Sequence, residues 1–172
     1  AIPMYESTAE LEVSYGEYGS LTSSLQTRLP MDSLQMQMDV SWKEFGDFRD
    51  GNDVMLTDSL DLENPKFRYL DEAAGRDIYR IRQLETSGTY TFSSTQYLEF
   101  SGRYSDSEDV YFPELRLDAE YDRGGNVSAS YHVENPSSSV QRLSVRAFTS
   151  TAQQELNDRW RYSKIRNLEN AA

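Results

Sequence analysis

The single histidine is the first residue whose chemistry matters, because imidazole is the usual general base near neutral pH. His132 lies in an alternating run and shares one side of it with Ser128, Ser130 and Glu134. A Ser–His–acid triad in this chain would have to use this histidine. Nothing near it in the sequence favours that role, and the chain has no cysteine for thiol chemistry. The sequence therefore predicts a solvent-facing strand residue, no catalytic group and no enzymatic activity.

An acidic stretch gives the second candidate site. Asp47, Asp50 and Asp53 surround Gly51, and oxygen ligands in a glycine-bearing turn suit Ca²⁺. However, Arg49 occupies the position of the second ligand in an EF-hand loop. One histidine and no cysteine also argue against a zinc or copper site. We predict no metal and no cofactor, and the three aspartates are only a weak calcium candidate.

The uneven distribution of charge gives the strongest candidate for binding. Residues 1–139 carry 11 Lys and Arg against 26 Asp and Glu, whereas residues 140–172 carry 6 against 3. Within 159–166, cations alternate with aromatic and aliphatic residues, and Arg and aromatic side chains are enriched at interface hot spots. We predict that this basic arm docks on an acidic surface, of its own chain or of a neighbour. The interacting residues would be Arg159, Trp160, Arg161, Tyr162, Lys164 and Arg166.

Several other partners are disfavoured. A net charge of −12 repels phosphate, so we expect no direct binding of nucleic acid. The chain has no glycine-rich phosphate loop. No run approaches the ~18 apolar residues of a membrane-spanning helix, and the sequence predicts no membrane span.

The elements that position these residues are predicted from hydrophobic alternation. Leu34, Met36, Met38, Val40 and Trp42 alternate with polar residues, which is typical of a half-buried strand. The short links between such runs leave no room for parallel crossovers. We therefore predict a mainly β fold, an antiparallel sandwich or closed barrel of roughly seven to nine strands with a C-terminal helix. The β domain would cover residues 1–150, and residues 151–172 would form the helix and basic arm, packed on that domain or on a neighbour.

Three segments are predicted to lie outside strands. Residues 122–126 contain Gly124 and Gly125 between two alternating runs, which favours a tight hairpin. Residues 105–109 are predicted to form an acidic loop, and residues 16–30 to be polar and irregular.

Two functions follow from these expectations. The first is a non-catalytic assembly or interaction protein, a self-associating subunit of a particle, filament or larger complex, which uses its basic aromatic C-terminus against acidic surfaces. The alternative is a small β-barrel that carries an apolar ligand or pigment. Its predicted lining is Met36, Met38, Trp42, Phe92 and Phe100.

Overall fold

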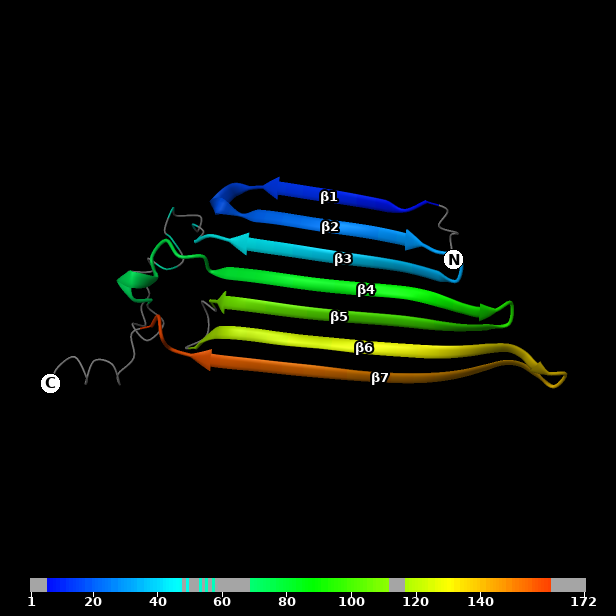
Figure 1. Ribbon diagram of the computed structural model, residues 1–172. Coiled ribbons are helices and arrows are strands. Elements are labelled where there is room, and N and C mark those ends of the chain that lie inside the picture. Colours follow the sequence, from blue (N-terminus) through cyan, green and yellow to red (C-terminus); the bar gives the residue numbers. More distant parts are fainter. Residues whose placement is uncertain are drawn as a thin grey trace.

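The chain forms one seven-stranded sheet in which the strands follow each other in sequence order and every neighbouring pair is antiparallel (Figure 1). This computed structural model describes residues 6–47, 49, 53, 55, 57, 69–111 and 117–161. The strands are β1 (Thr8–Tyr15), β2 (Leu21–Pro30), β3 (Leu34–Phe45), β4 (Tyr79–Ser93), β5 (Gln96–Val110), β6 (Asp118–Ser137) and β7 (Val140–Asn157). Two single 3₁₀ turns, η1 (Glu17–Gly19) and η3 (Asp71–Ala73), complete the described elements.

The mainly β, antiparallel prediction is confirmed, but its finer parts are not. The sheet is open, with β1 and β7 at opposite edges, so it is neither a closed barrel nor, in the described ranges, a two-layer sandwich. The predicted C-terminal helix is wrong for residues 151–157, because they continue β7 and pair with β6. Strand β7 thus runs through the expected domain boundary at residue 150, and residues 162–172 lie outside the described chain. Among the described residues, no helix has the length and apolar character needed to cross a membrane.

The two ends of the sheet differ in their connections (Figure 1). At one end, which we call the turn end, the links are short and comprise residues 31–33, 94–95 and 138–139. At the other, the connection end, the links comprise residues 16–20, 46–78 and 111–117, and the chain after β7 leaves from the same side. The longer segments are therefore gathered on one side of the sheet.

The two faces of the sheet also differ, because directly opposed residues lie on the same face. One row runs Leu11, Leu25, Val40, Leu84 and Tyr104 across β1 to β5. We call its side, which also carries the Leu34–Trp42 and Val127–Val133 alternations, the apolar face. The next row runs Gln26, Asp39, Glu85, Arg103 and Asn126 across β2 to β6, and its side is the polar face.

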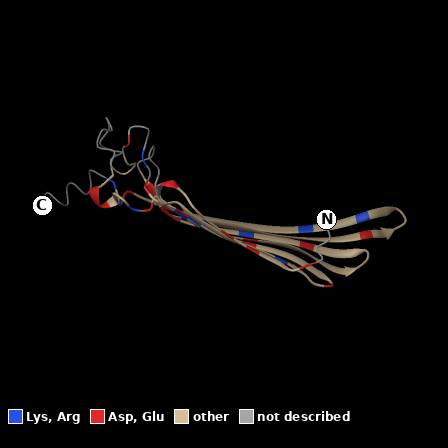
Figure 2. Cartoon of the chain, turned by 90° about the horizontal axis from the view of Figure 1, so that it is seen from above, with Lys and Arg blue, Asp and Glu red and all other residues tan. Residues whose placement is uncertain are grey.

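Among the described residues, the hydrophobic core lies at the connection end. Tyr69, Ala73, Ile78 and Tyr111 are buried there, with Trp160 packed against them. In the strands the sheet is a single twisted layer (Figure 2), and all eight residues of β1 are exposed. The described chain therefore leaves most of both faces uncovered.

The predicted hairpin at residues 122–126 is wrong, because these residues lie inside β6 opposite β5. Gly125 is needed there for another reason. A Cβ at this position would lie 2.8 Å from the carbonyl oxygen of Arg103 and 3.4 Å from the ring of Tyr104. The glycine makes room for the neighbouring strand, and the chain reverses at residues 138–139 instead.

The other two segments predicted to lie outside strands also pair. Residues 105–109 belong to β5, and residues 21–30 form β2, which pairs with both β1 and β3. In each case, pairing with neighbouring strands determines the strand structure, although the composition of the segment is polar.

Candidate functional site

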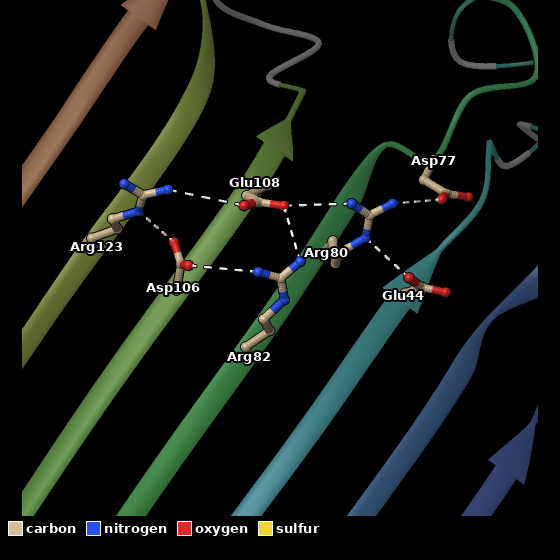
Figure 3. A network of polar contacts seen from close by, with 7 residues as sticks. All are labelled: Glu44, Asp77, Arg80, Arg82, Asp106, Glu108 and Arg123. Carbon is tan, nitrogen blue, oxygen red and sulfur yellow. Dashed lines mark hydrogen bonds and ion pairs between the residues drawn. The ribbon is translucent and has the colours of Figure 1, made fainter.

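A network of ionic side chains crosses four strands at the connection end of the apolar face (Figure 3). Register places Arg80 opposite Glu44 and Glu108, and Arg82 opposite Asp106. The closest pairs are Arg123 Nε–Asp106 Oδ1 at 2.7 Å and Arg80 Nε–Glu44 Oε1 at 3.0 Å. We call the whole set the charge ladder. Its members are Glu44, Asp77, Arg80, Arg82, Asp106, Glu108 and Arg123.

Each arginine of the charge ladder is held from more than one side. Arg80 also contacts Asp77 at 3.3 Å, and the Arg82 guanidinium lies 4.7 Å from the centre of the Trp42 ring. Burial would lower the pKa of Arg80, but the hydrogen bond and ion pair with Glu44 outweigh it and raise the pKa. With three cations and four carboxylates, the ladder is a nearly neutral polar band, and it offers no unshielded charge of one sign.

A second ionic cluster is buried at the connection end of the sheet. Arg161 is 1% exposed and Asp118 is 2% exposed. Arg161 Nε donates to Asp118 Oδ2 at 2.8 Å, and Arg161 Nη2 donates to Asp118 Oδ1 and, at 2.5 Å, to the Tyr69 hydroxyl. That hydroxyl in turn donates to Asp118 Oδ1 at 3.0 Å. A buried pair of this kind is costly to break, because removing one partner leaves an uncompensated charge.

The tyrosines around this buried cluster are held neutral. Burial, followed by the charge of Asp118, raises the pKa of Tyr69 far above its usual range. Burial also raises the pKa of Tyr111 to about 12. The Tyr111 ring stacks on Tyr69 with 5.2 Å between ring centres, and its hydroxyl has no hydrogen-bond partner among the described residues. These two phenols pack as apolar rings and are poorly suited to acid–base chemistry at neutral pH.

The described part of the predicted basic arm binds its own chain. Arg161 and Tyr69 form an isolated antiparallel bridge, and the Trp160 carbonyl accepts a hydrogen bond from the Leu70 amide at 2.7 Å. The guanidinium groups of Arg76 and Arg159 lie 4.0 and 4.8 Å from the centre of the Trp160 ring. For Arg161, the acidic partner is thus Asp118 of the same chain. Tyr162, Lys164 and Arg166 lie outside the described residues.

His132 has more partners than its sequence context indicates. Its ring stacks on Tyr97 with 4.6 Å between ring centres. Its Nδ1 lies 2.8 Å from Ser144 Oγ, and its Nε2 lies 3.1 Å from Glu99 Oε2. The side chain is 13% exposed, so it is largely covered by these neighbours on the polar face.

The Ser144–His132–Glu99 chain has the order of groups found in a serine hydrolase triad. Acyl transfer also needs donors for an oxyanion and a pocket for the substrate. Two hollows among the described residues lie elsewhere, one around Gln37, Glu85 and Asn126 and one around Asp109 and Trp160, and neither includes Ser144 or His132. We therefore assign the contacts among Ser144, His132 and Glu99 to packing between β5, β6 and β7.

The weak calcium candidate is only partly within the described chain. Asp47 is buried and accepts hydrogen bonds from the backbone and side chain of Thr57. Asp53 pairs with Arg49 at 3.0 Å, and Asp50 lies outside the described residues. No group of three or more His, Cys, Asp or Glu side chains in the described ranges is arranged to hold a metal ion.

The predicted lining of a ligand-carrying barrel lies on one surface. Met36, Met38 and Trp42 share the apolar face with Phe100, which is opposite Gly88 and Ala129. Phe92 contacts Tyr90 and Tyr131 on the same side. Because the sheet is open, these five residues line a surface rather than an enclosed cavity.

No family model, no curated protein and no solved structure matches this chain. The sheet and its side chains are therefore the basis for any functional argument.

Sequence reasoning missed the charge ladder, although a signal for it was present. Arg80 and Arg82 are two residues apart, as are Asp106 and Glu108, so each pair lies on one side of its strand. Recognising the ladder required the β4–β5 register, and the acidic residues were instead predicted to form a loop.

Proposed function

We propose that this chain is a non-catalytic sheet protein that works inside a larger assembly. In that assembly, further strands continue the sheet at β1 and β7, and another surface covers the apolar face. The observation that carries the proposal is the pair of long open edges. Strand β7 has 18 residues and all but the last are exposed, and the eight residues of β1 are exposed as well. Long exposed edge strands present unpaired backbone groups that favour pairing with another strand.

The uncovered apolar face supports the same proposal. Leu11, Val13 and Tyr15 in β1 are 71%, 63% and 78% exposed, and Val145 in β7 is 60% exposed. A sheet is stable when its apolar face is buried against another layer. The described chain supplies such a layer only at the connection end, so the remaining cover has to come from elsewhere.

The proposal keeps the predicted class of function and changes the binding surface. The basic arm was expected to dock on an acidic surface, and Arg161 already has Asp118 of its own chain as its partner. The surfaces offered to other molecules are instead the two edges and the apolar face of the sheet.

The mass of the protein, isolated from its source without denaturant, tests the proposal. We expect light scattering to give a mass well above the 19.8 kDa of one chain. A 19.8 kDa species with the full circular-dichroism signal of the sheet would overturn the proposal, because the edges would then be stable without partners.

Two proline variants locate the contact at β7. Amides of successive residues in an edge strand point alternately to the neighbouring strand and to the open edge. We therefore compare Ala147→Pro with Phe148→Pro, made separately. The variant that loses an amide pointing to the open edge should keep its strand content, and its assembled species should have a lower mass. The other variant should lose a backbone hydrogen bond between β6 and β7. If both folded variants keep the original mass, β7 is not the assembly edge.

A further inference from the structure

The exposed apolar side chains of this molecule are concentrated on one face of the sheet. Eighteen large hydrophobic residues are exposed among those described, and register, together with the ring contacts of Phe92, places twelve of them on the apolar face. They are Leu11, Val13, Tyr15, Leu25, Val40, Leu84, Tyr90, Phe92, Tyr104, Val127, Leu143 and Val145. Exposed apolar residues gathered on one face in this way mark an interaction surface, whereas singly scattered ones are normal. We infer that the apolar face contacts the acyl chains of a lipid bilayer.

The distribution of aromatic rings favours lipid over a protein partner. Tyr15, Trp42 and Tyr104 lie toward the connection end of the apolar face. Tyr90, Phe92 and Tyr131 lie toward the turn end and contact one another edge to face, with ring centres 4.9 and 5.9 Å apart. Protein interfaces concentrate aromatic hot spots near their centre. Sheets that face lipid carry aromatic residues at both borders of an apolar band.

The middle of the band consists of two uncharged rows of opposed residues. One row contains Leu29, Met36, Gly88, Phe100, Ala129 and Ala147, and the next contains Thr27, Met38, Thr86, Gly102, Val127 and Thr149. The aromatic ring of Phe100 covers Gly88, where a Cβ would come within 2.5 Å of the ring. The order along the strands is therefore aromatic, then uncharged with small and aliphatic side chains, then aromatic.

The length of the band suits the hydrocarbon core of a bilayer. On β3 it extends from Leu34 to Trp42, and on β4 from Leu84 to Phe92, nine residues in each case. A tilted strand crosses the hydrocarbon with ~9–11 residues. At ~3.4 Å per residue, nine residues reach about 30 Å along the strand.

The charge ladder begins at the connection-end border of the band, in the row of Trp42. Arg82 is opposite Trp42, and Arg80 and Glu108 lie one step further out. Paired ionic groups next to a ring of aromatic side chains suit the water and headgroup region, where charged groups stay solvated. Figure 2 shows charged residues gathered near the connection end.

The connections at the two ends give an independent argument. Residues 31–33, 94–95 and 138–139 are tight links at the turn end, whereas residues 46–78 and 111–117 are long links at the connection end. Short turns on one side and long loops on the other are typical of antiparallel sheets that cross a membrane.

The inference rests on the proposed function, because hydrocarbon offers no water to unpaired backbone groups. A sheet in that medium must have both edges paired, so further strands have to continue β1 and β7. The polar face would then be turned away from lipid, and its hydrogen bonds between Gln26 and Asp39 and between Ser101 and Ser128 suit a wet or protein-filled side.

Single cysteines test the inference directly, because the chain has none of its own. We would place an environment-sensitive fluorophore at Val127→Cys and Val145→Cys on the apolar face, and at Ser128→Cys and Arg146→Cys on the polar face. The protein would be folded in the presence of phosphatidylcholine vesicles. We expect lipid-attached quenchers to quench the labels at positions 127 and 145 several-fold more than those at 128 and 146, and aqueous iodide to show the reverse.

A second pair of variants tests the requirement for an apolar surface. Val127→Arg should remove the vesicle-bound fraction in a flotation assay, because it puts a charge in the middle of the band. Ser128→Arg, the next residue on the opposite face, should leave that fraction unchanged.

The outcomes separate this inference from the proposed function. Labels at positions 127 and 145 that are shielded equally with and without vesicles, in a multi-chain species, would show that protein covers the face. That result overturns the lipid inference and leaves the proposed function standing. Labels equally open to iodide on both faces, in a species of one chain, would overturn both.

Discussion

The connection end and the strand region of this sheet are stabilised in different ways. At the connection end, Tyr69, Ile78 and Tyr111 form a small core around the buried Arg161–Asp118 pair. In the strand region, backbone ladders hold the sheet, and side chains as apolar as Leu11 and Val13 remain exposed. The described chain therefore supplies its own cover at one end and leaves the apolar residues elsewhere exposed.

The largest effect is expected from breaking the buried ion pair. Asp118→Asn removes the charge that compensates Arg161, and loss of one partner of such a pair costs about 3–5 kcal/mol. Urea unfolding followed by circular dichroism measures the change. Asp122→Asn, an exposed residue in the same strand, is the matched control and should stay within about 0.5 kcal/mol of the parent. A loss below about 1 kcal/mol for Asp118→Asn would mean that this end does not depend on the pair.

A pair of apolar truncations compares the two regions. Ile78→Ala empties a site that is 7% exposed, so it should lower the free energy of unfolding by about 2–5 kcal/mol. Val13→Ala removes a side chain that is 63% exposed, so in the unassembled chain it should cost no more than about 0.5 kcal/mol. Equal losses in the two variants, measured by the same urea titration, would remove the distinction between the regions.

Removal of the buried hydroxyl of Tyr111 should have a smaller effect and should raise the free energy of unfolding. Its hydroxyl has no described partner, so Tyr111→Phe should stabilise the protein by up to about 1 kcal/mol.

Tyr111→Phe should also change the pH dependence of the free energy of unfolding. The pKa of Tyr111 rises from 10.0 to about 12 on folding, so the unfolded chain loses the proton first. The free energy of unfolding is therefore unaffected by this titration below pH 10 and falls as the pH rises from 10 through 12, because the unfolded chain then carries the ionised phenol. Tyr111→Phe should therefore flatten the fall in stability over that pH range. An unchanged alkaline slope would contradict burial of this hydroxyl.

The smallest effect is expected in the charge ladder. Asp106→Asn weakens contacts to Arg123 and Arg82, and because these arginines are 40% and 42% exposed, the loss should not exceed about 1 kcal/mol. Raising the salt concentration should shrink the difference further, since salt screens exposed charges. A loss as large as that of Asp118→Asn would mean that the ladder belongs to the core.

Much of the strand pattern could be predicted from sequence. The alternation from Leu34 to Trp42 was predicted to form a strand and lies in β3, since a two-residue period depends only on local backbone geometry. In this case the local chain chemistry agrees with the final structure.

Other features depend on partners distant in sequence. Gly124 and Gly125 were interpreted as a turn, but Gly125 accommodates Arg103 and Tyr104 of β5, and Gly124 lies against the carbonyl oxygen of Thr151 in β7. Asp106 and Glu108 were interpreted as a loop, because their arginine partners are known only from register. Residues 151–157 pair with β6, and this tertiary pairing overrides a weak helical pattern.

The apolar face was the hardest feature to foresee. Its residues occupy every second position of seven strands, so no single segment is strongly hydrophobic. No feature of the sequence predicted a single open layer, because each alternating run is also consistent with a sandwich.

Amide hydrogen exchange of the assembled protein is the sharpest test of whether other strands pair with β1 and β7. In β1 and β7, every second amide points away from the described sheet. We predict that these outward amides are protected to a degree comparable with amides of β4 and β5, because another strand pairs with them. Outward amides that exchange as fast as those of an unfolded chain, while β4 and β5 remain protected, would contradict this prediction and make the open sheet the complete structure.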